Sequence, residues 1–359
     1  MRVDFSDKTV GGFNYELVRG LSVQQAGAAE LGECMETMER ITANDFGSWV
    51  AEWEKTAARV LDHARQLAKD DRPGAREAFM RASNYFRMAC FYAAHTDPRH
   101  KDLWSRSRDC FHCMAALAEY PIEKVGVKFE GAVLPGYFMP AGRENRPTLI
   151  AIGGFDSTKE ELYCWIGSAA REYGWNCLVF EGPGQWGALM DNPGLVFRPD
   201  YEKPVGAAVD YLMTRGDIDK EKIAVIGYSM GGYLCVRGAL DPRTGKPMLF
   251  LFSEDDIIDA AAPDKIIAAG LLDYIQSLDC PRYVRLFTKE EGASGHCQMG
   301  GLTYARTAVF GWLEHALCGG KIENRGAGCS DLFVELFGKY GGAEGAVKAQ
   351  ALVNEVTFI

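Results

Sequence analysis

The sequence predicts an α/β fold, in which a mostly parallel sheet has helices on both faces and follows a helical N-terminal block. Two observations support this prediction. Up to about residue 120, apolar residues recur at helical spacing and no strand-like alternation interrupts them. After Pro121, short apolar runs that end in glycine alternate with helical segments, which is typical of a sheet buried on both faces. The chain of 359 residues is long enough for one large domain or two smaller ones.

Composition and charge exclude several classes of protein. The 47% of hydrophobic residues excludes wholesale disorder. The net charge of −10, without clustered lysines and arginines, argues against a nucleic-acid partner. The apolar runs are too short to cross a bilayer, and the N-terminal residues MRVDFSDKTVGG do not resemble a secretory signal. We therefore expect a cytoplasmic protein with no membrane partner, whose 11 cysteines are mostly buried, reduced thiols.

The N-terminal block contains three clear helical patterns, at residues 51–69, 74–96 and 101–118. Asp97 and Pro98 are predicted to stop the second helix. The third contains Cys110 and Cys113, which have the spacing of half a zinc site. No second pair completes four ligands, so we expect ordinary helix packing and no metal.

The segment after Pro121 begins with a predicted hairpin of strands 125–130 and 132–139, joined at Gly131. Further strands are expected at 148–152, 176–180 and 222–226, with helices at 159–173 and 201–215. Each of these later strands ends in a glycine-containing turn. Open α/β sheets place their sites at such carboxyl ends.

Residues 223–232, IAVIGYSMGG, combine a buried strand, a G-x-S-x-G motif and the start of a helix. This is the context of a nucleophile elbow, in which Ser229 projects above the sheet. Gly227 and Gly231 are expected because side chains there would clash with the neighbouring strand and helix. The amide of Met230 then points at a developing oxyanion. The second oxyanion donor is expected to be the backbone amide of Phe155, after two glycines that allow close approach of the chain.

A serine nucleophile needs a base, and in this architecture the chain order is serine, acid, histidine. His296 follows the strand-like run 283–287 in a glycine-rich loop, whereas His315 lies inside the helical pattern 305–317. The remaining histidines precede Ser229 in the helical block: His63, His95, His100 and His112. His296 is therefore the predicted base.

The acid is expected after the buried run 248–252. Asp256 is our first choice, with Asp255 and then Asp264 as alternatives. Its role would be to hold the imidazole tautomer and to stabilise the imidazolium.

Residues 81–92 place Asn84 and Tyr85 on one helix face with Arg81. One interpretation is a packed helix with a paired arginine. The other is that Asn84 and Tyr85 line the roof of a substrate pocket, with Asp156 as a further candidate substrate-binding residue.

Several of these motifs together resemble a known family. They are GGFDSTKEE at 153–161, FEGPGQ at 180–185, GYSMGGY at 227–233, EEGASGHCQMG at 290–300 and RASNYFRMACFY at 81–92. They are similar to one branch of the α/β-hydrolases, which contains 2,6-dihydroxypseudooxynicotine hydrolase, the polyketide-shortening hydrolases of melanin pathways and the fusarin-cluster type of hydrolase. The resemblance covers roughly residues 40 to 317.

The resemblance implies a helical lid and dimerisation domain at 1–120, a catalytic core at 121–318, and a tail at 319–359 without a counterpart. It implies a Ser-Asp-His triad, matched by Ser229, the Asp255/Asp256 region and His296. It also implies a homodimer, no cofactor, and cleavage of carbon–carbon bonds next to ketones, or of esters and lactones, in polyketide-like compounds. Secondary-metabolite biosynthesis is the implied setting.

The sequence departs from the family after the elbow helix. Residues 240–247 bridge to the acid-bearing strand directly, where the family has a few dozen residues and one interior strand. Either the strand at 248–252 takes the interior place, or the chain lacks a strand. Trp186 also stands where the family has glycine. This departure keeps an inactive, binding-only fold open as one alternative to a hydrolase. A second alternative is an acyl-transfer or cyclisation catalyst with the same triad, in which the helical lid excludes water.

Overall fold

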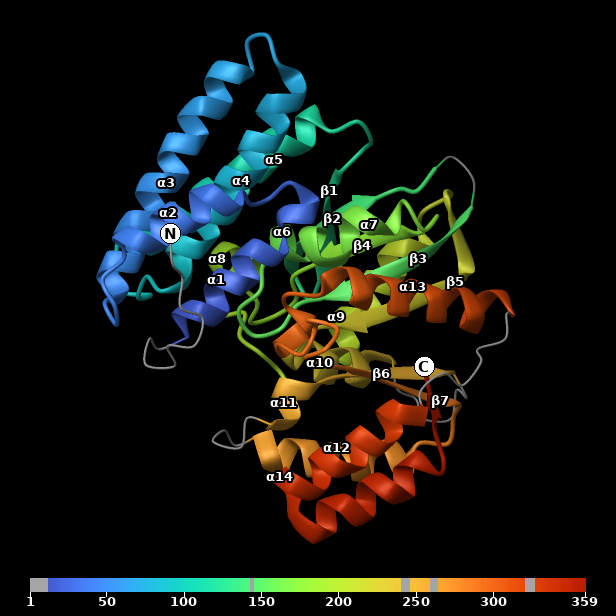
Figure 1. Ribbon diagram of the computed structural model, residues 1–359. Coiled ribbons are helices and arrows are strands. Elements are labelled where there is room, and N and C mark those ends of the chain that lie inside the picture. Colours follow the sequence, from blue (N-terminus) through green and yellow to red (C-terminus); the bar gives the residue numbers. More distant parts are fainter. Residues whose placement is uncertain (1–11, 143–144, 240–245, 259–263, 320–326) are drawn as a thin grey trace. The chain divides into compact units, whose positions relative to one another are not determined.

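A computed structural model describes residues 12–142, 145–239, 246–258, 264–319 and 327–359 (Figure 1). The chain forms two compact units, Met1–Gly238 and Ala239–Ile359, and each is described by itself. No helix in the described ranges has the length and apolar character to span a bilayer. No disulfide joins the cysteines whose side chains are described.

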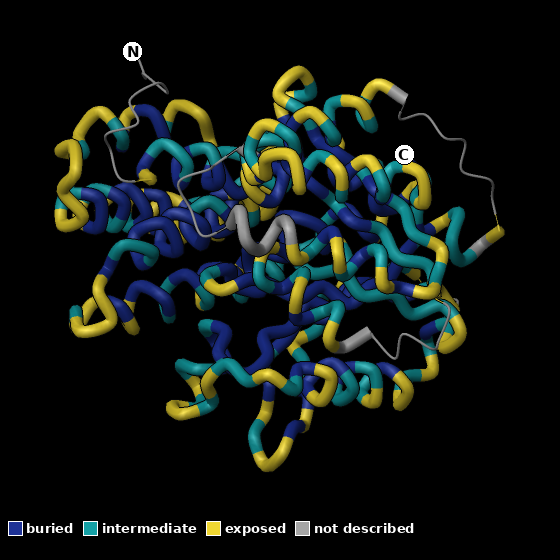
Figure 2. The backbone as a smooth tube through the Cα atoms, turned by 90° about the horizontal axis from the view of Figure 1, so that it is seen from below, coloured by how far each residue is buried: buried dark blue, intermediate teal, exposed yellow. Residues whose placement is uncertain are grey.

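The first unit opens with helices, as predicted. They are α1 (Phe13–Ser22), η1 (Gln24–Ala26), α2 (Leu31–Arg40), α3 (Phe46–Leu67), α4 (Arg72–Phe91) and α5 (Arg99–Leu117). The side chains of Asp45 and Asp71 cap α3 and α4 by accepting backbone N–H groups of the first turn. The second predicted helix ends at Phe91, earlier than expected. Helix α3 buries one face, as amphipathic helices do, whereas residues 82–90 of α4 are all buried. Figure 2 shows buried and exposed stretches along the whole backbone.

The strands of the first unit form a sheet of order β1-β2-β4-β3-β5. They are β1 (Glu123–Phe129), β2 (Ala132–Met139), β3 (Arg146–Ile152), β4 (Asn176–Phe180) and β5 (Ile218–Gly227). The hairpin β1–β2 is antiparallel, and β3 pairs in parallel with β4 and β5. Ile152 lies opposite both Phe180 and Gly227, so the loops after these three strands begin at the same edge of the sheet.

Helices connect the parallel strands of this sheet, and one more helix follows the last strand. They are α6 (Lys159–Leu162), η2 (Tyr163–Gly167), α7 (Ser168–Ala170), α8 (Trp186–Asp191), α9 (Glu202–Met213) and α10 (Met230–Ala239). The predicted helix at 159–173 contains a π-helical segment, η2, where five residues complete a widened turn. Ile150 and Leu178 of the sheet share one apolar core with Leu212 of α9 and Leu234 of α10.

A buried group of charges joins the N-terminal helices to the segment after β3. Nε and Nη2 of Arg19 each donate to Glu161 at 2.7 Å, and Nη1 lies 3.2 Å from Glu16. Arg87 Nη1 lies 3.5 Å from both Glu16 and Glu161. All four side chains are 2–3% exposed. Buried charges persist in folded proteins when they are paired, so this group accounts for the last glutamate of GGFDSTKEE.

The second unit contains three parallel strands in the order β6-β7-β8. Its elements are β6 (Met248–Ser253), α11 (Glu254–Ile258), α12 (Asp264–Ser277), β7 (Arg282–Phe287), η4 (His296–Gln298), α13 (Leu302–Cys318), α14 (Ala327–Val353) and β8 (Thr357–Phe358). Ser253 lies opposite Phe287, so the segments after β6 and β7 start at one edge. Most of the shortened bridge, including Arg243, lies outside the described residues.

The C-terminal tail, for which the sequence offered no role, completes the apolar core of the second unit. Phe333 and Phe337 of α14 are buried, with ring centroids 4.6 Å apart, and Phe252 of β6 lies 5.2 Å from Phe333. Phe358 of β8 pairs with Val284 of β7. Residues from Ala327 onward are therefore a structural part of this unit.

Candidate active site

Ser229 occupies a tight turn between β5 and α10. Its backbone φ is 56°, in the left-handed region that non-glycine residues rarely adopt. The amide of Gly231 bonds to the carbonyl of Tyr228 at 2.8 Å and closes the turn. A non-glycine residue held in this region stores strain, which is a property of nucleophile elbows.

The glycines of the motif are there because their surroundings leave no room for a side chain. A Cβ on Gly227 would overlap the carbonyl group of Gly231. A Cβ on Gly231 would lie 2.5 Å from the carbonyl oxygen of Gly153. A Cβ on Gly154 would lie 2.9 Å from the Cβ of Ser229, so the backbone of the loop after β3 lies directly against Ser229.

The loop after β3 carries the predicted oxyanion donor. The amide of Gly154 donates to the buried hydroxyl of Ser157 at 2.9 Å, so it is engaged within the loop. The amide of Phe155 has no acceptor among the residues that the structure describes. Met230 begins α10, and the first amides of a helix have no intrahelical acceptor. Both predicted donors therefore belong to backbone that borders Ser229.

An aromatic pair stands beside this loop. The side chain of Phe155 is 66% exposed and stacks on Phe197, with ring centroids 5.6 Å apart and planes inclined by 16°. Val196, next to it, is 62% exposed. Exposed aromatic faces are suited to contact a flat apolar ligand.

His296 and Asp256 form a close pair in the second unit. Asp256 lies in α11 directly after β6, and His296 opens η4 in the loop after β7. His296 Nδ1 is 2.8 Å from Asp256 Oδ1 and 3.0 Å from Oδ2. The hydrogen bond to Asp256, followed by one to Cys297, raises the pKa of His296 above its ordinary value.

The other two candidate acids stand elsewhere. Asp255 accepts the Ser294 hydroxyl at 2.7 Å and lies 3.3 Å from Lys289 Nζ. It therefore supports the loop that carries His296. The side chain of Asp264 lies outside the described residues. Of the described acids, Asp256 is the one in contact with the histidine.

Two further residues that sequence reasoning missed also fix the histidine loop. Glu254 accepts the backbone amide of Lys289 at 2.9 Å, and Gln298 donates to the buried Ser253 hydroxyl at 2.9 Å. Cys297 and Gln298 have φ angles of 57° and 58°, so the backbone turns sharply after His296. The sequence held one signal for Glu254: the acidic run after β6 contains more carboxylates than one triad needs.

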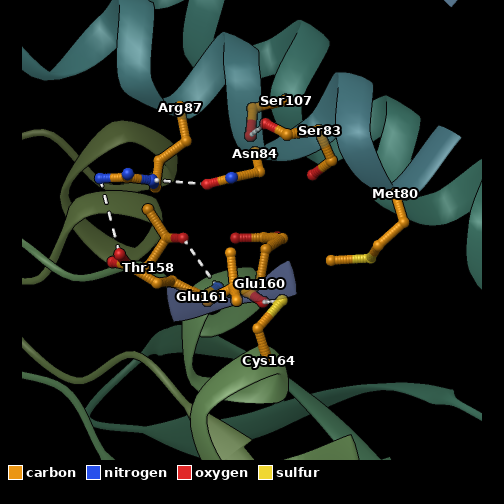
Figure 3. A pocket seen from close by; sticks show the side chains of 10 residues that line it. Met80, Ser83, Asn84, Arg87, Ser107, Thr158, Glu160, Glu161 and Cys164 are labelled. Carbon is orange, nitrogen blue, oxygen red and sulfur yellow. Dashed lines mark hydrogen bonds and ion pairs between the residues drawn. The ribbon is translucent and has the colours of Figure 1, made fainter. Parts of the chain in front are cut away.

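The candidate lid residues are engaged inside the N-terminal helices. Asn84 donates to the carbonyls of Gly20 and Ala28 at 3.1 and 2.9 Å. The cavity that it lines has a volume of about 10 Å³, room for about one water molecule. Figure 3 shows Asn84 and Arg87 of α4 facing Glu160 and Glu161 across it. A site for a metabolite is far larger.

Tyr85 is fully buried, and its hydroxyl donates to Glu33 at 2.9 Å and accepts the Glu30 amide at 2.8 Å. Arg81 pairs with the same Glu33 at 3.1 Å. These contacts favour the interpretation of a packed helix with a paired arginine. Asp156, by contrast, is 44% exposed and lies 3.3 Å from Arg19, within the loop that borders Ser229.

We expect Tyr85→Phe to lower the free energy of unfolding by about 1–3 kcal/mol, because the Glu30 amide and Glu33 each lose a partner. Turnover should be unchanged under conditions where the variant is folded. Urea unfolding and steady-state kinetics measure the two effects. A changed KM with unchanged stability would instead place Tyr85 in the substrate pocket.

Comparison with known proteins gives relatives from fungi, while no protein-family model matches the chain. Hydrolase ORFZ of Pyricularia oryzae is 36% identical over 249 residues, which cover 64% of this chain and 58% of that protein. Alpha/beta hydrolase xenA of Xenoacremonium sinensis is 35% identical over 244 residues, which cover 64% of this chain and 57% of that protein. The chain thus spans less than two thirds of the length of these relatives.

Among solved structures, 2,6-dihydroxy-pseudo-oxynicotine hydrolase has a similar fold, with a TM-score of 0.63 at 21% identity. The match covers 84% of this chain and 97% of that one. The sheet order and the strained serine between β5 and α10 are the features expected of an α/β-hydrolase fold, and the fold of this solved structure agrees with them. This chain has the α/β-hydrolase fold, and its sequence is similar to those of the fungal hydrolases named above.

Proposed function

We propose that this protein is a serine hydrolase that cleaves a small ketone- or acyl-bearing, polyketide-like metabolite. The observation that supports it best is Ser229 itself, a non-glycine residue at a φ of 56° with the Phe155 loop against it. A strained serine beside backbone amides that border it has a ready explanation in nucleophilic catalysis. The His296–Asp256 pair supplies the base and the group that orients it.

In the proposed reaction the Ser229 hydroxyl attacks the substrate carbonyl, and its proton passes to Nε2 of His296. Asp256 holds the Nδ1–H and stabilises the imidazolium. The amides of Phe155 and Met230 stabilise the oxyanion. Collapse of the tetrahedral intermediate expels the leaving group, which takes the proton from His296. Water then hydrolyses the acyl-enzyme by the same steps and restores Ser229.

The leaving group decides which bond is broken. An ester or lactone releases an alcohol, whereas a carbon–carbon substrate must release a carbanion that an adjacent ketone stabilises, and His296 or a water protonates it. The stacked rings of Phe155 and Phe197 support a flat, partly aromatic substrate.

A fluorophosphonate probe combined with an isotope experiment tests the proposal. We expect the probe to label the folded protein at Ser229, as located by mass spectrometry. In ¹⁸O-labelled water, cleavage of a panel of aryl diketones and p-nitrophenyl esters should yield a carboxylic acid that carries one added ¹⁸O.

Other outcomes would contradict it in distinguishable ways. Folded protein without labelling at Ser229 would indicate a binding-only fold. Labelling with product that lacks ¹⁸O would indicate acyl transfer or cyclisation, in which an internal hydroxyl or amine takes the acyl group.

A further inference from the structure

Gln185 connects two loops at the carboxyl edge of the first sheet, those after β3 and β4. It lies in the loop after β4, immediately before α8, and its side chain is 0% exposed. Its Nε2 donates to the carbonyl of Gly153 at 2.6 Å and to that of Gly154 at 3.3 Å. Its Oε1 accepts the amide of Gly182 at 2.7 Å and the hydroxyl of Tyr201 at 3.2 Å. The side chain therefore uses its donor and its acceptor at the same time.

The acceptors of Gln185 are the carbonyls of the loop that bears the predicted oxyanion donor. The peptide group between Gly154 and Phe155 contains both the Gly154 carbonyl and the Phe155 amide. Because a peptide group is planar, a hydrogen bond that orients this carbonyl also orients the amide, which points the opposite way. Gly153, the other acceptor, has its carbonyl oxygen against Gly231 of the elbow.

We propose that Gln185 is a positioning residue that fixes the direction of the Phe155 amide toward the substrate oxyanion of the tetrahedral intermediate bound to Ser229. This inference rests on the proposed hydrolase function. Ser157 holds the loop from the other side through the Gly154 amide, so the two residues together determine its orientation. A donor that is displaced from the oxyanion loses its effect on the transition state while it leaves ground-state binding unchanged.

The substitution Gln185→Glu tests the positioning role, because the pH determines whether the new carboxyl group is neutral or charged. A protonated glutamate reproduces the amide, because its O–H donates to Gly153 and its carbonyl oxygen accepts from Gly182. An ionised glutamate has no donor and repels the Gly153 carbonyl. Burial raises the pKa of such a carboxyl, so the neutral form is the one present at low pH.

We expect the ratio of variant to wild-type kcat to fall as the pH rises from about 5 to about 9, from near unity to a loss of about 100-fold, the effect of losing one oxyanion donor. KM should not change. The rate of fluorophosphonate labelling of Ser229 should fall in parallel. Gln185→Met, which is neutral and has neither hydrogen-bonding atom, should lose activity to a similar extent at every pH.

Asn176→Asp is a matched control at the start of β4, the end of the strand opposite to Gln185. Asn176 is also buried, and its amide donates to Arg146 and Thr148 while it accepts from Ala141. If Gln185 acted only through stability, both substitutions would lower kcat together with the thermal unfolding midpoint. We expect Asn176→Asp to change the midpoint but not the pH dependence of kcat.

The outcomes separate this inference from the proposed function. Wild-type protein that is folded but is not labelled at Ser229 would overturn both. Labelled wild type with a Gln185→Glu ratio that stays near unity at all pH values would overturn the role of Gln185 alone. If Gln185→Glu does not fold, unchanged kcat in Gln185→Met would overturn it equally.

Discussion

Ser229→Ala is expected to lower kcat by about 10⁴-fold or more while the protein stays folded. Loss of the nucleophile removes the steps that depend on the covalent intermediate and leaves only binding and oxyanion effects. The backbone keeps its φ of 56° with alanine as with serine, so the strain is the same in both proteins. We expect the free energy of unfolding to change by no more than about 1 kcal/mol. Ester turnover and the thermal unfolding midpoint measure the two quantities.

A second serine provides the control for this substitution. Ser168 begins α7, in the segment between β3 and β4, and Ser168→Ala should keep turnover near the wild-type rate. If Ser229→Ala keeps turnover within about tenfold of wild type, Ser229 is not the nucleophile. If both variants lose activity together with stability, the loss reflects folding and not chemistry.

The fold was largely predictable because its signals are local. Apolar runs that end in glycine gave β3, β4 and β5 within a few residues, and the turn at Gly131 gave the hairpin β1–β2. The tail was not predictable, because α14 is rich in glycine and its partners lie far away in the chain. Phe333 contacts Phe252, and no sequence pattern predicts this contact.

The candidate site was predictable only in part, for a related reason. Chain order and the glycine motif selected Ser229, His296 and the acidic run as the candidate site residues. Helical periodicity correctly placed Asn84 and Tyr85 together on α4, but it does not state what faces them. The partners of Tyr85, Glu30 and Glu33, lie at the start of α2, a helix whose pattern was too short to recognise.

Polar contacts between residues far apart in the chain could not be predicted from the sequence. Arg19 meets Glu161, which is 142 residues away. Gln185 meets Gly153 across two different loops. The family motifs contain both Glu161 and Gln185, and only the structure assigns them contacts. The family motifs therefore contain more than the candidate catalytic residues. Glu161 and Gln185 belong to them through contacts that support the surrounding backbone.

Asp256→Asn is expected to lower kcat by up to about 10⁴-fold, because an amide no longer selects the required imidazole tautomer or stabilises the imidazolium. The pH profile adds a second expectation. Asp256 raises the pKa of His296, and the base must be neutral to accept a proton, so wild-type kcat/KM should rise with pH through a value above the ordinary 6.5 or so of histidine. Removing the carboxylate lowers that pKa, so the acid limb of the profile should move to lower pH while the plateau falls.

Asp255→Asn is the matched control, since it removes the same charge from the neighbouring residue. Asp255 contacts Ser294 and Lys289, not the imidazole, so we expect a loss below about tenfold and an acid limb that does not move. Asp264→Asn completes the series of candidate acids. If either of these variants lost more activity than Asp256→Asn, the acid of the triad would be assigned to the wrong residue. If the acid limb of Asp256→Asn moved to higher pH, the pair at 2.8 Å would not be the one that sets the basicity of His296 during turnover.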